Sequence, residues 1–279
     1  MLQVSAARAL CGAILLVVTG FPAMSAADAG PGCAAESIVS GRRIERTVAV
    51  AGVARHFILD VPETIAAGAA VPVLFDFHGW GHSGPGVWKV SKFRDFAPAE
   101  QFITVYPDGL PVSLRGGEAR PGWEIRAVEG NRDVAFTRAM LEILEREYCI
   151  DRGRIYSTGF SNGAFFSNLL ACALPETFAA IAPVGGGRIT VPCAPKQAVP
   201  VLFHHGTQDE VVPLAGALEA RDRWVAINEC RETRTEGACE RHTGCREGVE
   251  VVFCRADGAH TWPPEATRRI WDFVQRWRR

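Results

Sequence analysis

A serine flanked by glycines is the first feature of this sequence that indicates chemistry. In the stretch GFSNGA, Ser161 lies midway between Gly159 and Gly163 and directly follows the apolar run RIYSTGF. A serine on a tight turn between a strand and a helix is typical of a nucleophile elbow, where glycines two residues away avoid steric clashes. The same residues would suit an ordinary glycine-rich turn, so the interpretation depends on what the rest of the chain supplies.

Two further residues complete the set that a serine nucleophile requires. Asp209 ends the run VPVLFHHGTQD and His260 ends VEVVFCRADGAH, so each is expected just beyond a strand. A serine hydroxyl is a weak nucleophile until an imidazole takes its proton, and a carboxylate orients that imidazole. The order serine, acid, histidine along the chain is the one found with nucleophile elbows. Asp257 is the competing acid, but it is too close to His260 in the chain to reach behind the ring.

A reaction that passes through a tetrahedral oxyanion also needs hydrogen-bond donors placed in advance. The backbone N–H of Asn162, directly after the serine, is one expected donor. The second is expected in the glycine-rich loop FHGWGHSG, at the backbone N–H of Trp80. His78 is expected to shape this loop without titrating in catalysis. The other histidines are expected to be structural or surface groups: His56, His82, His204, His205 and His242.

The candidate residues lie in a chain that alternates strand-like and helix-like segments. Buried strands are expected at 71–79, 102–109, 154–160, 178–187, 199–209 and 249–260. Helices are expected at 131–148, 162–174, 214–228 and 267–277, and a hairpin is expected ahead of them at 46–62. The stretch 110–130 has no clear period and is expected to be a long surface loop.

This alternation indicates an α/β fold, in which helices cover both faces of a mostly parallel central sheet. Reactive groups in such sheets lie on loops at the carboxyl ends of the strands, where all three candidate residues are expected. The chain has no large insertion that could form a lid domain, so an open cleft is expected.

The N-terminal residues are typical of a secretory signal peptide. Arg8 precedes the apolar run ALCGAILLVV, which is shorter than the ~20 residues of a membrane span. Cleavage after Ala27 fits as well as cleavage after Ala29, so residues 1–27 or 1–29 are expected to be removed, with a membrane anchor as the alternative. Residues 33–279 are then expected to form a single catalytic domain in an exported protein, with a cysteine-rich segment at 230–254.

The charge balance argues against some classes of partner. Thirty Lys and Arg residues stand against 31 Asp and Glu residues, for a net charge of −1. A chain without a basic field is not expected to bind nucleic acid or an anionic membrane surface.

Eight cysteines remain once Cys11 leaves with the signal peptide: Cys33, Cys149, Cys172, Cys193, Cys230, Cys239, Cys245 and Cys254. An even number of cysteines in an exported chain favours disulfides. The competing interpretation is a zinc site in CERHTGC, where Cys239, His242 and Cys245 have ligand-like spacing. Because the export signal favours oxidised pairs, no metal is expected.

Six motifs, in this order, resemble those of secreted esterases of the feruloyl esterase and poly(3-hydroxybutyrate) depolymerase-like group: FHGWGHSG, YPDG, DVAF, GFSNGA, HHGTQDEVVP and GAHTWP. The similarity covers the chain from about Val71 to the C-terminus. It implies an α/β-hydrolase fold, hydrolysis of carboxylic esters without a metal or organic cofactor, and a triad at Ser161, Asp209 and His260. Two departures replace one small residue by another: Ala164 for a second glycine after the elbow, and the sequence DGAH before the histidine.

The resemblance also bears on the disulfides, since members of the group often pair a cysteine after the last long helix with one before the final strand. That position matches Cys230 with Cys245. The two additional cysteines allow an interlaced arrangement (Cys230–Cys245, Cys239–Cys254) or a nested one (Cys230–Cys254, Cys239–Cys245). Cys172 and Cys193 bracket the strand after the elbow helix and are expected to pair, which leaves Cys33 with Cys149.

The function expected from these residues is that of a secreted serine esterase with an acyl-Ser161 intermediate. Its substrate is expected to be a feruloyl or acetyl ester of plant polysaccharide, or alternatively a hydroxyalkanoate polyester, so it can be polymeric. Trp80, Trp123 and Trp262 are expected around the cleft, where indole faces would suit aromatic acyl groups or sugar rings. The alternatives are a hydrolase-fold binding protein that has lost the reaction, and an acyltransferase or peptidase with the same triad.

Overall fold

The computed structural model describes residues 33, 39–65, 69–114 and 116–279. The expected signal peptide, residues 1–27 or 1–29, and its cleavage position lie outside these residues. None of the helices in the described ranges is both long enough and apolar enough to cross a membrane.

A ten-stranded sheet forms the centre of the described fold. Its strands, from one edge to the other, are β1 (Gly41–Val50), β2 (Val53–Val61), β4 (Ile103–Pro107), β3 (Val71–Phe77), β7 (Ile150–Phe160), β8 (Ala180–Val184), β9 (Val201–Gly206), β12 (Val251–Ala256), β11 (Cys239–Thr243) and β10 (Glu232–Glu236). The strands from β4 to β12 pair in parallel, whereas both edges of the sheet are antiparallel. The expected mostly parallel sheet is therefore present.

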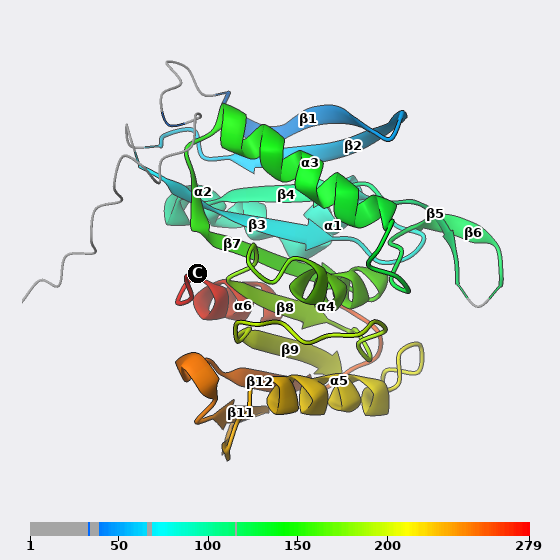
Figure 1. Ribbon diagram of the computed structural model, residues 1–279, viewed down its shortest axis with the longest axis vertical. Helices are drawn as coiled ribbons and strands as arrows, with labels where there is room; N and C mark the ends of the chain where they lie inside the picture. The colour runs from blue at the N-terminus through cyan, green and yellow to red at the C-terminus, as the bar shows by residue number, and fades with distance from the viewer. Residues whose placement is uncertain (1–32, 34–38, 66–68, 115) are drawn as a thin grey trace, which may run out of the picture.

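Helices cover both faces of this sheet: α1 (Gly84–Ser91), α2 (Ala97–Glu100), α3 (Arg132–Glu147), α4 (Asn162–Ala173), α5 (Leu214–Ile227) and α6 (Ala266–Val274), with short 3₁₀ turns at Phe93–Asp95 and Arg246–Gly248. In Figure 1, α3, α4 and α5 lie in front of the sheet and α6 lies behind it. The two faces have separate apolar cores, one including Phe136, Leu169 and Trp224 and the other Phe102 and Trp271.

Local sequence explains the helix that precedes the elbow strand. The side chain of Asn131 accepts hydrogen bonds from the N–H groups of Asp133 and Val134, which caps the N-terminus of α3. Strands β3, β4 and β8 are buried along their whole length, because helices cover both faces of the parallel sheet.

The expectation for residues 110–130 is wrong in part. Strands β5 (Leu110–Ser113) and β6 (Ala119–Gly122) form an antiparallel hairpin, and the chain then enters the core at Trp123. The hairpin projects on the side toward which the arrowheads of β3, β8 and β9 point (Figure 1). The sequence also did not predict α1, α2 or the β10–β11 hairpin, of which β10 is exposed along its whole length.

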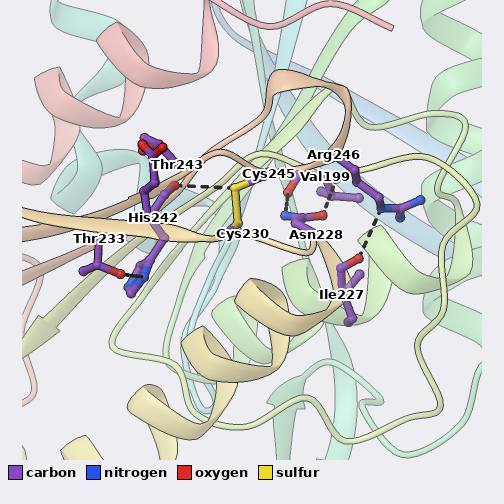
Figure 2. Close-up of a disulfide and its surroundings, with 10 residues drawn as sticks. Val199, Ile227, Asn228, Cys230, Thr233, His242, Thr243, Cys245 and Arg246 are labelled. Atoms are coloured by element: carbon purple, nitrogen blue, oxygen red, sulfur yellow. Dashed lines mark hydrogen bonds between the residues drawn. A yellow bond between two sulfur atoms is a disulfide. The ribbon is translucent and has the colours of Figure 1, made fainter.

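Four disulfides connect the eight cysteines as the interlaced arrangement predicts: Cys33–Cys149, Cys172–Cys193, Cys230–Cys245 and Cys239–Cys254. Because Cys239 and Cys245 belong to different disulfides, they leave no thiolate for the alternative zinc site. Figure 2 shows how Asn228, two residues before Cys230, exchanges two hydrogen bonds with the backbone of Val199, 2.7 and 3.1 Å long. This end of α5 is thereby joined to the start of β9.

Candidate active site

The serine at the end of β7 occupies a strained turn. Ser161 has φ 53° and ψ −116°, a conformation that residues with a Cβ rarely adopt. Its N–H donates to the carbonyl oxygen of Val184 at the end of β8 (2.9 Å), and its carbonyl accepts from Ala164 and Phe165 in the first turn of α4. Strand, turn and helix therefore follow one another without a linker, as a nucleophile elbow requires.

The glycines around Ser161 are needed because neighbouring backbone passes very close. A Cβ at Gly159 would lie 2.7 Å from the carbonyl oxygen of Phe77 on β3, and a Cβ at Gly163 would lie even closer to the same oxygen. Ala164, the departure from the related esterases, packs against Gly186, where a Cβ would lie 2.6 Å from the alanine methyl group. The extra methyl group is accommodated because residue 186 has none.

The expected acid and base are in contact. Oδ2 of Asp209, in the loop after β9, lies 2.6 Å from Nδ1 of His260, in the loop after β12. The other carboxylate oxygen accepts the N–H groups of Val211 and Val212 (3.0 and 2.8 Å), which orients the acid. Because Nδ1 is occupied by the carboxylate, Nε2 is the ring nitrogen left for other work. Asp257, the competing acid, is exposed on the surface.

A second histidine supports the acid from behind. His205 is buried, and its Nε2 donates to the carbonyl oxygen of Val212 (2.8 Å) and lies 3.5 Å from Oδ2 of Asp209. Burial lowers the pKa of His205, so the ring is neutral near pH 7. His205 therefore shapes the turn that carries Asp209, in agreement with the structural role expected for it.

The loop after β3 is built around His78. This residue is fully buried, and burial lowers its pKa to about 4, so that it is neutral near pH 7. Its Nε2 accepts the N–H of Gly109 (2.9 Å), and its Nδ1 donates to the carbonyl oxygen of Gly79 (2.7 Å). The prediction that His78 shapes the loop without titrating agrees with these contacts.

Trp80 and Asn162, the expected oxyanion donors, both line the cleft that contains Ser161. Neither backbone N–H has a hydrogen-bond acceptor among the described residues. Both donors are therefore available to an atom placed in the cleft, at the N-terminus of α4, where the helix dipole favours negative charge.

The cleft has a volume of about 910 Å³, and Ser161 and His260 both form part of its wall. The ring of Phe160 packs against that of His260 at a centroid distance of 4.7 Å and also faces the cleft. Further apolar side chains in the lining include Leu114, Ile125, Phe165, Val211 and Val212, and the cationic ones are Arg126 and Arg188. The arrangement can hold an apolar or aromatic group next to a serine, an imidazole and two free N–H donors.

Of the three tryptophans expected around the cleft, Trp80 lines it, whereas Trp123 and Trp262 do not. Trp80 lines the cleft, with its Nε1 donating to the carbonyl oxygen of Val112 (2.9 Å). Trp123 has 0% exposure and packs in the core, so the expectation that it contacts substrate is corrected. Trp262 packs edge-on against Phe93 away from the cleft lining, and its Nε1 donates to Thr267. Trp123 and Trp262 are therefore packing residues.

The segment that passes between Trp80 and Asn162, the two expected oxyanion donors, was not predicted from the sequence. Pro121, Gly122 and Trp123 fall in the stretch expected to be a surface loop, yet they contact both the loop after β3 and the elbow. A tryptophan beside a glycine in an otherwise polar stretch was the available signal, and it did not specify a partner.

The fold and the strand-end loops define an α/β-hydrolase. The structure is similar to that of an acetyl xylan esterase from Aspergillus awamori, with a TM-score of 0.65, 16% sequence identity and coverage of 83% of this chain and 98% of that one. At this level of identity the likeness establishes the fold.

The sequence profile described as "Phospholipase/Carboxylesterase" matches residues 63–253, more than half of the chain. The protein therefore belongs to the phospholipase/carboxylesterase family and is a carboxylic ester hydrolase.

Curated relatives confirm the resemblance to feruloyl esterases. The chain is 27% identical to feruloyl esterase D of Neurospora crassa over 291 residues, covering 94% of this chain and 96% of the relative. It is also 27% identical to feruloyl esterase B of Piromyces equi over 253 residues, covering 79% of this chain and 45% of that longer protein.

Proposed function

We propose that the protein hydrolyses feruloyl or acetyl esters of plant polysaccharide through an acyl-enzyme formed on Ser161. The observation that carries this proposal is the 2.6 Å contact between Asp209 and His260, whose ring shares a cleft wall with the strained serine. A binding protein that had lost the reaction would have no need to keep this contact or the strained turn.

In the first half of the proposed reaction, Ser161 Oγ attacks the ester carbonyl carbon while its proton passes to Nε2 of His260. Asp209 stabilises the resulting imidazolium through Nδ1. The negative charge that develops on the carbonyl oxygen is stabilised by the N–H groups of Trp80 and Asn162. The tetrahedral intermediate then collapses, the C–O bond to the alcohol breaks, and His260 returns the proton to the departing alkoxide.

In the second half, His260 takes a proton from water as the water oxygen attacks the acyl carbon. The same donors stabilise the second oxyanion, the bond to Ser161 Oγ breaks, and the serine regains its proton from His260. The products are the free acid and the polysaccharide alcohol, and no oxidant, metal or other cofactor enters the balance.

The substrate class is supported by the names of the relatives and by the lining of the cleft. Phe160, Phe165 and Ile125 offer apolar surface to an aromatic or short acyl group beside the serine. We expect the cleft to be open, because the chain has no large insertion that could form a lid, so that a polymer can extend beyond it.

We also propose that the protein works outside the cell. The four disulfides support this location, since such bonds persist in oxidising compartments, and the N-terminal sequence supports it independently.

The test is a comparison of purified wild type and Ser161→Ala on methyl ferulate, acetylated xylan and amorphous poly(3-hydroxybutyrate). We expect wild type to release ferulate or acetate and the variant to release neither. Release of hydroxybutyrate alone would replace the proposed substrate by the polyester, and equal activity of the two proteins would overturn the role of Ser161. Addition of a competing alcohol distinguishes hydrolysis from acyl transfer by the new ester that a transferase would form.

A further inference from the structure

The segment Pro121–Trp123 crosses the molecule between the two loops that carry the oxyanion donors. Its first contact is with the loop after β3: the N–H of Gly81, next to Trp80, donates to the carbonyl oxygen of Pro121 (2.7 Å). Gly122 then passes so close to both donor residues that a Cβ there would lie 3.0 Å from Cδ1 of Trp80 and 2.8 Å from Oδ1 of Asn162.

Trp123 binds the elbow through its backbone. Its N–H donates to Oδ1 of Asn162 (2.7 Å), and its carbonyl oxygen accepts from Nδ2 of the same side chain (3.2 Å). A side-chain amide that exchanges two hydrogen bonds with one backbone residue is held in a single orientation. Since Asn162 is 3% exposed, water cannot replace these bonds.

The indole of the same residue binds the other loop. Nε1 of Trp123 donates to the carbonyl oxygen of His78 (2.8 Å), two residues before Trp80. The ring is held by stacking on Phe166 of α4 and by an edge-on contact with Phe77 of β3, with centroid distances of 5.3 and 5.0 Å. One residue thus contacts both donor-bearing loops by hydrogen bonds and by ring packing.

The segment is itself anchored from behind. The N–H of Glu124 donates to Oδ2 of Asp133 (2.8 Å), while Oδ1 of Asp133 is 2.7 Å from Nη2 of Arg55. Both charged side chains are buried, so removal of either one would leave the other without its partner. Trp123 is therefore attached to the α3 side of the sheet as well as to the two loops.

We propose that Trp123 is a positioning residue that sets the spacing between the Trp80 and Asn162 N–H groups, and so the affinity of the site for an oxyanion. The proposal rests on the proposed function, because it assigns these two groups to the oxyanion. Trp123 does not touch the substrate. It acts through His78 and Asn162, and its loss should weaken transition-state binding far more than substrate binding.

The test uses Trp123→Phe, which removes the indole N–H and keeps an aromatic ring, together with Asn162→Ala, which removes the other side of the same connection. The matched control is Trp224→Phe. Trp224 is as fully buried as Trp123, and its Nε1 likewise donates one hydrogen bond, to Oδ1 of Asn168 (2.9 Å), away from the cleft. We expect kcat on p-nitrophenyl acetate to fall about 10- to 100-fold in the first two variants with KM changed less than about threefold. Trp224→Phe should lower Tm but leave kcat within about twofold of wild type.

Inhibition by a trifluoromethyl ketone, whose adduct with the serine places an oxyanion in the site, separates positioning from general damage. The inhibition constant should rise in the two test variants by the same factor as kcat/KM falls. If Trp123→Phe lowers Tm as Trp224→Phe does while kcat and ketone affinity remain near wild type, the proposal is overturned. If Ser161→Ala retains activity, the proposed function fails, whatever Trp123 does.

Discussion

The two ends of the parallel strands are stabilised in different ways. At the amino ends of the strands, three disulfides involve Cys149 just before β7, Cys172 at the end of α4 and Cys230 after α5. At the carboxyl ends of the strands, the loops that carry Ser161, Asp209 and His260 are held by hydrogen bonds and packing. These three covalent links thus lie away from the site proposed for catalysis, and the fourth, Cys239–Cys254, joins β11 to β12 within the sheet.

This difference separates stability from geometry. A disulfide restricts the unfolded chain and adds stability without specifying where a distant donor lies. The hydrogen bonds around Trp123 and Asp209 each fix an orientation, and each contributes only about 1 kcal/mol to stability. Changes at the amino ends of the strands should therefore affect the free energy of unfolding, whereas changes at the carboxyl ends should affect the rate of the reaction.

The largest expected effect on activity is at the carboxyl ends of the strands, in Asp209→Asn. An asparagine of the same shape would still accept from Val211, but it would present an N–H to Nδ1 of His260 and favour the wrong tautomer. We expect kcat to fall by about 10³- to 10⁴-fold with little change in Tm, measured by p-nitrophenyl acetate hydrolysis and thermal unfolding.

The matched control for that variant is Asp257→Asn, which removes an exposed carboxylate three residues before the same histidine. Its activity should remain within about twofold of wild type. A smaller loss in Asp209→Asn than in Asp257→Asn would transfer the acid role to Asp257.

The next largest effect is on stability, at the amino ends of the strands, where Cys172→Ala and Cys193→Ala together remove a disulfide between residues 21 positions apart. The loss of stability should be about 3 kcal/mol, because the unfolded chain regains the entropy of that loop. The kcat measured well below Tm should be unchanged, since Ser161 lies at the other end of α4. A loss of activity at low temperature, with the fold intact, would contradict the view that the amino ends of the strands determine stability and the carboxyl ends determine activity.

A smaller effect is expected at Asp76, near the end of β3. This carboxyl group is fully buried, and burial raises its pKa from 3.8 to about 7, an effect that the nearby Ser91 hydroxyl only partly offsets. Between these values the folded protein binds a proton that the unfolded chain has lost, so this group makes stability fall as pH rises.

The variant Asp76→Asn should lack this fall. Each pKa unit corresponds to about 1.4 kcal/mol, and with relaxation around the site we expect the variant to gain up to about 2 kcal/mol relative to wild type between pH 5 and pH 8. Denaturant unfolding at several pH values measures this gain, and a constant difference between the proteins would contradict the assignment of the proton to Asp76.

The sequence was informative where the chemistry restricts the type of residue. Ser161, Asp209 and His260 could be proposed because each follows a recognisable apolar strand and because their order along the chain is characteristic. The parallel strands were predictable for a similar reason, since strands buried on both faces are continuous apolar runs.

The features that were missed depend on partners distant in the chain. Trp123 bonds to residues 39 and 45 positions away, and nothing in its neighbours distinguishes it from a tryptophan in a cleft wall. Strand β10 is exposed at every position, so its residues ETRTE lack the alternation that predicts a strand. In both cases tertiary contacts decide the structure, and a short sequence pattern does not contain them.

The central claim is that the strained serine on the elbow is the nucleophile that His260 activates. Labelling with a fluorophosphonate, followed by mass spectrometry of the digested protein, tests it most directly. We predict one adduct per chain on the peptide that contains Ser161, formed at least about 10³-fold more slowly in His260→Ala. An adduct on another residue, or no adduct on Ser161 in a protein that hydrolyses esters, would contradict the claim.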